Sequence, residues 1–143
     1  MSVKTDHIHW LGHDSIRIDS CLTIYIDPWE VDGPTADLIL ITHDHYDHCD
    51  PATVKKLSGP KTVVVTDRDS AAKLRAEGLE NHIPVVYPLD DIEFTGVCIN
   101  VLPSYHLNHD FHPPSTGHLA FIFAIYGLSL SPAGASYFLP SIT

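Results

Sequence analysis

The sequence predicts a single α/β domain, and two observations lead to that fold class. Strand and helix patterns alternate between residues 36 and 87, where apolar runs at 36–42, 61–66 and 83–87 are separated by helical stretches. Such alternation implies parallel strands joined by right-handed crossovers. The chain of 143 residues also has the size of one domain and shows no linker-like change in composition and no internal repeat. We therefore assign residues 1–143 to one domain.

Further strands are expected on both sides of the alternating segment. They are short runs rich in β-branched and aromatic residues, separated by polar turns. The expected strands are 7–11, 15–18 and 22–26 before this segment, and 91–94, 97–102, 118–126 and, with a weaker pattern, 128–131 after it. A long loop is expected at 103–117, and residues 127–143 lack the pattern of a closing helix.

The two expected helices carry recognisable end signals. The first follows Asp50 as N-cap, has Pro51 at its first helical position, and is expected to end just before Gly59. The second covers 68–78 and is closed by Gly78. The continuous apolar run 36–42, which precedes the first helix, indicates a strand covered on both faces.

Charge and cysteine content exclude some classes of partner and suggest a compartment. The formal charge is −10, with 8 Lys and Arg against 18 Asp and Glu, so a nucleic-acid partner is not expected. Three cysteines without C-x-x-C spacing indicate neither a disulfide framework nor a zinc knuckle. No apolar run has the length of a membrane span or of a signal-peptide core. We expect a soluble, cytoplasmic protein without a membrane partner.

A dense group of potential metal ligands follows the buried strand, in the stretch "THDHYDHCD" of residues 42–50. His43 and His45 are two residues apart, so in an extended segment their side chains point the same way. Asp47 and His48 follow as the chain turns into the first helix. Imidazole and carboxylate are the usual ligands of Zn²⁺ and neighbouring metals. The loop therefore predicts a metal site for one or two ions, with zinc, or manganese or iron in its place.

A metal held in this way would make hydrolysis at neutral pH accessible. It lowers the pKa of its bound water towards ~7, and a second metal about 3.5–4 Å away polarises the substrate oxygen. The alternative, a hydrophilic loop that binds nothing, does not account for four ligand-type side chains at the carboxyl end of a buried strand.

The motif "HDHYDH" at 43–48 resembles the H-x-H-x-D-H signature of the metallo-β-lactamase superfamily. The likeness extends to "WLGHDSIRI" near the start, "IYIDP" before the motif and "VLPSYH" after it. Together these stretches resemble the small metal-dependent hydrolases of the ascorbate-6-phosphate lactonase-like branch. The resemblance covers about residues 7 to 140.

The resemblance implies an αββα sandwich with metals at the edge between its two sheets. It implies that His43 and His45 bind the first metal, and that Asp47 and His48 bind the second. Asp47 is the implied catalytic residue, which orients the attacking water or accepts its proton. The third ligand of the first metal is expected after a strand, where His106 stands.

Some other polar residues receive weaker assignments. His112 is the reserve candidate for the third ligand. His13 is expected either at the site or in a structural hydrogen bond, and Asp27 is expected to orient a ligand histidine rather than only to form a turn. No role is assigned to His7, His9, His82 and His118.

The chain departs from the family pattern in its last part. Where the family has "Y-H-A-G-D-T", this chain has "SPAGAS", with Pro132 in place of the histidine and Ala135 in place of a bridging aspartate. The family pattern also continues beyond Thr143 to a final histidine ligand. We therefore expect a sandwich that is incomplete in its second half, with the C-terminal part of the family domain absent. A sheet face left open in this way favours a homo-oligomer.

Two functional hypotheses follow. The first is a metal-dependent hydrolase that uses metal-activated hydroxide on an ester, lactone or phosphoester bond of a small-molecule substrate. The second is a catalytically impaired metal-binding remnant, or a fragment that needs a partner chain. A nuclease of the same superfamily is a weaker third reading, against which the charge of −10 argues.

Overall fold

The computed structural model describes residues 6–104, 117–125 and 135–139. Its first sheet contains five strands in the order β1-β2-β3-β4-β5. Their bounds are Ile8–Gly12 (β1), Ser15–Asp19 (β2), Thr23–Ile26 (β3), Ala36–Leu40 (β4) and Ser58–Val65 (β5). The first three strands pair antiparallel, and β3-β4 and β4-β5 pair parallel. The sheet thus begins as an antiparallel hairpin and ends as the parallel sheet that the sequence predicts.

Strands β3 and β4 are buried on both faces. Their apolar residues follow one another without polar residues in alternation, so both faces can pack against other parts of the protein. Side chains of successive residues point to opposite faces of a strand. On one face Leu38 and Leu40 join a core shared with the second sheet. On the other face Ile39 and Ile41 join a second core with the helices. The continuous apolar run is therefore explained by two cores, one on each side of the sheet.

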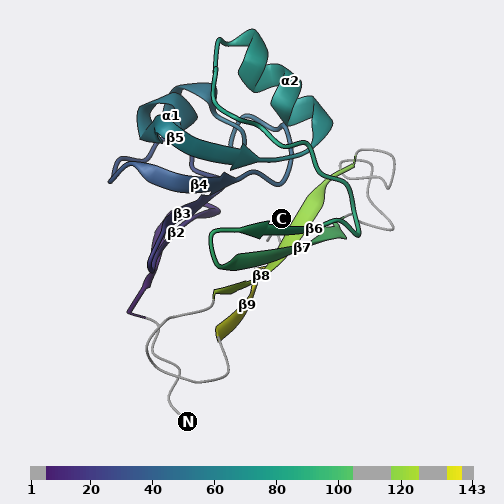
Figure 1. Cartoon of the computed structure of the whole chain (residues 1–143). Coiled ribbons are helices and arrows are strands. Elements are labelled where there is room, and N and C mark those ends of the chain that lie inside the picture. The colour runs from purple at the N-terminus through teal and green to yellow at the C-terminus, as the bar shows by residue number, and fades with distance from the viewer. Residues whose placement is uncertain (1–5, 105–116, 126–134, 140–143) are drawn as a thin grey trace.

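The second sheet is an antiparallel meander in the order β6-β7-β8-β9. Its strands are Asp91–Phe94 (β6), Val97–Pro103 (β7), Leu119–Ile125 (β8) and Ala135–Leu139 (β9). Its inner face packs against the first sheet through Val97, Ile99 and Val101 of β7 and through Leu119 and Phe121 of β8, all buried in the shared core. Figure 1 shows the two sheets facing each other, with the helices on the far side of β4 and β5.

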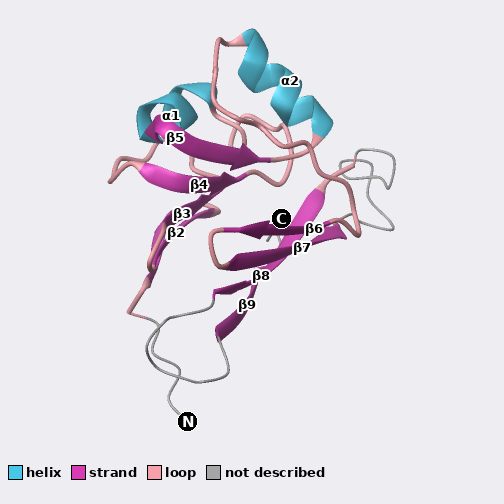
Figure 2. Ribbon diagram, in the orientation of Figure 1, coloured by secondary structure: helices cyan, strands magenta, loops and turns pink. Residues whose placement is uncertain are grey.

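Helices α1 (Pro51–Leu57) and α2 (Arg68–Ala76) cover the outer face of the first sheet (Figure 2). The N-cap of α2 is Asp67, whose side chain accepts a hydrogen bond from the backbone N–H of Asp69. Gly78, in the left-handed region with φ +85°, follows the end of α2 as expected. Neither of these helices, which are those found in the described ranges, has the length and apolar character needed to cross a membrane.

These layers make three quarters of the predicted sandwich: helices, first sheet, second sheet. Among the described residues no helix packs on the outer face of β6–β9, as both α1 and α2 contribute to the core behind the first sheet. The prediction of an αββα sandwich that is incomplete in its second half agrees with this arrangement.

The structure corrects three expectations about single elements. Residues 83–87 do not form a strand: the segment makes one isolated bridge, between Val85 and Thr66 just after β5, because Pro84 has no N–H to donate and interrupts the ladder. Helix α1 ends at Leu57, and Gly59 belongs to β5 instead of capping the helix. Residues 135–139 form a strand, β9, that the sequence did not predict. The predicted strand 128–131 lies outside the described residues.

Candidate metal centre

The histidine-rich loop lies where the carboxyl ends of β3 and β4 meet the turn between β1 and β2. Residues 43–50 leave β4 and lead into α1, while Asp27 follows the last residue of β3. Ligands of α/β sheets bind at the carboxyl ends of their strands. The loop is therefore held by the part of the molecule that is buried on both faces.

A buried carboxylate, Asp27, organises this region. Asp27 is 2 % exposed and has φ +43°, a left-handed conformation at the point where β3 ends. Its Oδ1 accepts the backbone N–H of Thr42 at 2.8 Å, and its Oδ2 accepts the Thr42 hydroxyl at 2.7 Å and Nδ1 of His48 at 2.8 Å. The sequence predicts that Asp27 orients a ligand histidine, and in the structure Asp27 hydrogen-bonds to His48. It fixes the orientation of that imidazole.

The hydrogen bonds also assign the tautomers of two histidines. The hydroxyl of Thr42 donates its one proton to Asp27, so it accepts from Nδ1–H of His43 at 2.8 Å. His48 likewise donates from Nδ1 to the carboxylate of Asp27. In the neutral form of each ring, Nε2 then carries the lone pair. This is the arrangement of metal-ligating histidines, whose second nitrogen donates to a protein group.

The turn between β1 and β2 brings two more ligand-type side chains to the loop. Gly12 and His13 both have positive φ, at 107° and 48°, so the chain turns sharply before β2. The indole N–H of Trp10 donates to the carbonyl of His13 at 2.8 Å, which closes the turn. The ring of Trp29 lies edge-on against the His13 imidazole at 5.1 Å between centroids. These contacts direct His13 and Asp14 towards the loop.

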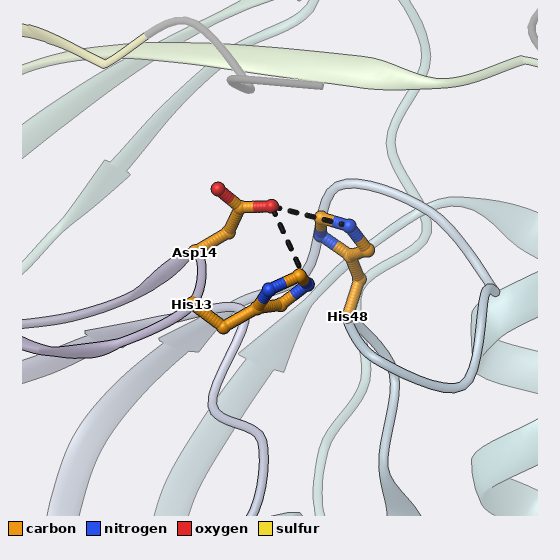
Figure 3. A group of neighbouring side chains, drawn as sticks. All are labelled: His13, Asp14 and His48. Atoms are coloured by element: carbon orange, nitrogen blue, oxygen red, sulfur yellow. Dashed lines mark ion pairs between the residues drawn. The ribbon is translucent and has the colours of Figure 1, made fainter.

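Figure 3 shows His13 and Asp14 of the β1–β2 turn facing His48 of the histidine-rich loop. Oδ2 of Asp14 lies 3.5 Å from Nε2 of His48 and 3.7 Å from Nε2 of His13. Asp47 stands beside them: its Oδ2 accepts Nε2–H of His13 at 2.8 Å and lies 3.8 Å from Nε2 of His48. Two imidazoles and two carboxylates therefore converge on one small volume.

A further group of ligand atoms lies on the other side of His43. The ligand atoms of Asp44, His45 and His118 lie within 4.8 Å of one another. The ring of His118 stacks on that of His43, with 4.4 Å between centroids. His118 reaches this place because Leu119, its neighbour at the start of β8, donates its N–H to the carbonyl of Thr42 at 2.9 Å. One backbone hydrogen bond thus joins the second sheet to the end of β4.

Burial and neighbouring charges shift several pKa values in this region. Burial raises the pKa of Asp27, although the hydrogen bonds from His48 and Thr42 oppose the rise. Burial tends to lower the pKa of His48, but its hydrogen bond to Asp27 and the nearby carboxylates outweigh burial and raise that pKa. For Asp47, burial is outweighed by the hydrogen bond from His13, and the pKa is lowered. Burial raises the pKa of Cys49 to about 12, so its thiol remains protonated at neutral pH.

The predicted site residues can now be located. The rings of His43 and His45 lie 4.6 Å apart and those of His43 and His48 4.0 Å apart, between centroids. Together with Asp47 these histidines form one cluster, as the motif indicates. The predicted third ligand, His106, and its reserve, His112, lie outside the described residues.

Two side chains of the cluster were not identified from the sequence. Asp14 is adjacent to His13 in the stretch that carries the family likeness, and that proximity was the available signal. His118 received no role because nothing in its local sequence distinguishes it. Only the pairing of its neighbour Leu119 with Thr42, far away along the chain, brings it to the site.

The described surface beside the cluster carries aromatic rings. Trp29 contacts His13 on one side and Tyr46 on the other, with 6.0 Å between the centroids of Trp29 and Tyr46. Tyr46 is 72 % exposed. The rings of Tyr46 and Trp29 therefore form a continuous aromatic surface from solvent to His13.

Comparison with known proteins identifies the family. The fold and a cluster of histidines and carboxylates at the sheet edge define a metallo-β-lactamase-like metal protein, and the family model described as "Beta-lactamase superfamily domain" matches residues 7–137. The chain belongs to this superfamily.

Individual relatives agree with this assignment. A UPF0173 metal-dependent hydrolase from Pyrococcus abyssi is 30 % identical over 141 residues, covering 91 % of this chain and 61 % of the relative. The crystal structure of a protein from Parabacteroides distasonis, assigned as a metal-dependent hydrolase, is 25 % identical with a TM-score of 0.72, covering 82 % of this chain and 55 % of that one. The Rm3 metallo-β-lactamase shares the fold, with a TM-score of 0.58 at 15 % identity, over 91 % of this chain and 57 % of its own. The chain thus spans less than two thirds of the length of these proteins.

Proposed function

We propose that this chain carries the metal centre of a hydrolase that cleaves an ester, lactone or phosphoester bond of a small molecule. The observation that supports the proposal is the cluster of His43, His45, Asp47 and His48 at the edge of the two sheets. The buried Asp27 and Thr42 orient His48 and His43 by hydrogen bonds to their Nδ1 atoms, as protein groups do for metal-ligating histidines. The metal-dependent hydrolases among its relatives support the same reaction class.

The donor set fits a borderline divalent metal such as zinc, with manganese or iron as alternatives. Imidazole nitrogens and carboxylate oxygens are the ligands of catalytic zinc sites. The tautomers assigned above leave Nε2 of His43 and His48 as the coordinating atoms. His43 and His45 would hold one ion, with His106 as the predicted further ligand, and Asp47 and His48 would hold a second. When bound, the metal supplies Lewis acidity that polarises a substrate oxygen and lowers the pKa of water towards ~7.

The protein's own groups then bind, orient and accept a proton. Asp47 is the proposed catalytic residue: its carboxylate orients the attacking water and accepts the proton that the water loses. The imidazole of His13 lies beside this carboxylate, with its Nε2 2.8 Å from Oδ2 of Asp47. The row formed by Trp29 and Tyr46 offers an apolar surface for the part of the substrate away from the reacting bond.

The experiment is turnover of three chromogenic probes, a phenyl ester, an aryl-substituted lactone and a phosphodiester, by the zinc-loaded chain. We expect hydrolysis of at least one probe, and loss of that activity with chelator and in His45→Ala. The matched control is His82→Ala, because His82 lies outside the cluster and pairs with β5 only through its backbone. Activity that survives both the chelator and His45→Ala would refute the proposal.

The alternative of an impaired metal-binding remnant, or of a fragment that requires a partner chain, is a distinct outcome of the same experiment. Its supporting observation is Ala135, which stands at the start of β9 where the family pattern has a bridging aspartate, since a methyl group cannot bind a metal. Zinc binding without hydrolysis of any probe would favour this alternative.

A further inference from the structure

We propose that the turn between β1 and β2 supplies two ligands, His13 and Asp14, to a second metal ion. The other two ligands are Asp47 and His48 of the opposite loop. The inference rests on the proposed function, because it concerns the same metal centre. In this proposal, His13 and Asp14 stand in for the bridging aspartate and the final histidine of the family pattern.

Three of the distances among the four ligand atoms are close to those of a tetrahedral site, and the ligand atoms of His13, Asp14 and His48 all lie within 4.8 Å of one another. With metal–ligand bonds of 2.0–2.1 Å, neighbouring ligand atoms of a tetrahedral zinc site lie about 3.3–3.4 Å apart. Oδ2 of Asp14 lies 3.5 Å from Nε2 of His48 and 3.7 Å from Nε2 of His13. Oδ2 of Asp47 lies 3.8 Å from Nε2 of His48. These separations are too long for hydrogen bonds and close to those between ligands of one ion.

A fourth pair of ligand atoms, those of His13 and Asp47, is joined by a hydrogen bond. Its length is 2.8 Å, from Nε2 to Oδ2. The metal would take the place of the proton on Nε2 of His13, which passes to solvent, and this separation would lengthen by about 0.5 Å to the tetrahedral spacing. The change is small, since the His13 side chain is 40 % exposed and has room to move.

The charges of the site call for a cation at the same point. Nδ1–H of His48 donates a hydrogen bond to Asp27, which leaves the lone pair of the neutral ring on Nε2. This atom faces two carboxylates, those of Asp14 and Asp47. A lone pair between two carboxylates is unfavourable unless a proton or a metal cation lies among them. His48 itself is held rigidly, with 5 % of its side chain exposed. The site is thus preorganised on one side and open to solvent on the other.

The turn that carries Asp14 is built to hold this geometry. Positive φ at the non-glycine residue His13 is strained, and such strain concentrates at functional sites. Behind the turn, Ser15 is fully buried and its hydroxyl donates to the carbonyl of Asp27 at 2.8 Å. The turn is therefore tied to the same residue that orients His48, and both sides of the proposed site share one anchor.

The test is a titration of the full chain with Co²⁺ and with Zn²⁺, followed by Co²⁺ absorption and by calorimetry. We expect the unmodified chain to bind about two ions. Asp14→Asn should weaken one of the two binding steps by more than about tenfold, since losing a ligand costs at least as much as losing a ligand's hydrogen-bond partner. Asp14→Cys should produce a thiolate-to-Co²⁺ charge-transfer band in the near ultraviolet. A purely structural role for Asp14 would not generate that band.

Asp19→Asn is the matched control. Asp19 belongs to the same hairpin and also faces an imidazole, with its Oδ2 2.9 Å from Nε2 of His9, but at the opposite end of the strands. This variant should bind both ions as the unmodified chain does. If Asp14→Asn does not fold, as judged by circular dichroism, His13→Gln and Asp14→Cys carry the same test.

The possible results separate the two proposals. Two binding steps that are unchanged in Asp14→Asn, with no charge-transfer band in Asp14→Cys, would overturn the inference and leave the metal centre of the proposed function intact. A chain that binds neither Co²⁺ nor Zn²⁺ would overturn both. One weakened step in Asp14→Asn with an unchanged Asp19→Asn is the result that supports the inference.

Discussion

Strands β3 and β4 of the five-stranded sheet are covered on both faces, whereas β7 of the four-stranded sheet alternates between buried and more exposed side chains. In β4 every residue except Asp37 is buried. In β7, Val97, Ile99 and Val101 are buried and Asn100 between them is exposed. The ligand-type loops grow from the doubly covered sheet, and the described part of the second sheet contributes one ligand-type residue, His118. Most ligand-type residues of the described cluster are thus held by the more deeply buried strands, which suits a site that must hold atoms within fractions of an ångström.

The largest expected effect tests the core that the two sheets share. Phe121→Ala should lower the free energy of unfolding by about 3–5 kcal/mol, because Phe121 is 2 % exposed between the sheets and its removal leaves a cavity. Urea unfolding followed by circular dichroism measures the loss. Leu102→Ala, on the partly exposed face of β7, is the control and should cost less. Equal losses in both variants would show that the two faces of the second sheet are packed alike.

A smaller effect is expected at the carboxylate that links the first sheet to the ligand loop. Asp27→Asn should weaken zinc binding about 10–100-fold, because an amide cannot accept from Thr42 and His48 with both oxygens as the carboxylate does. Competition with a chromogenic chelator measures the affinity. Asp37→Asn is the control, since Asp37 also accepts a backbone N–H, from Thr23, but is the one exposed residue of β4. An unchanged zinc affinity in Asp27→Asn would remove Asp27 from the metal centre.

The smallest effect is expected in the helices that cover the first sheet. In the described part of the chain, the second sheet has no such helices. Asp67→Ala should lower the free energy of unfolding by about 1 kcal/mol, the usual cost of losing an N-cap. The side chain of Asp67 accepts the N–H of Asp69 at 3.1 Å. Asp69→Ala keeps that N–H and should cost only a few tenths of a kcal/mol, through the helix dipole. A larger loss in Asp69→Ala than in Asp67→Ala would contradict the capping role.

The first sheet was largely predictable from local sequence signals. The continuous apolar run that becomes β4, Pro51 at the start of α1 and Gly78 after α2 each act over a few residues. The prediction of a strand at 83–87 was wrong. Its β-branched residues favour a strand, but Pro84 lacks the N–H that a continuous ladder needs there. Strand β9 was missed because its pairing with β8 is set by the sheet and not by its own pattern.

The site shows the same division between local and distant signals. The motif placed His43, His45, Asp47 and His48 in one cluster because all four lie in a single loop, and Asp27 was recognised at the end of its strand. Asp14 and His118 come from other parts of the chain. Their approach depends on the β1–β2 turn and on the hydrogen bond between Leu119 and Thr42. For Asp14 the adjacent His13 is the one local signal, and the residues around His118 contain none.

The β1–β2 turn also gives the molecule a built-in optical reporter. The chain has two tryptophans, and both contact His13: Trp10 through its indole N–H to the carbonyl, and Trp29 through ring contact with the imidazole. The intrinsic fluorescence of the protein therefore originates beside the proposed second metal position. Emission from this pair should follow the state of the turn without any attached dye, and each ion that reaches His13 alters the surroundings of both emitters at once.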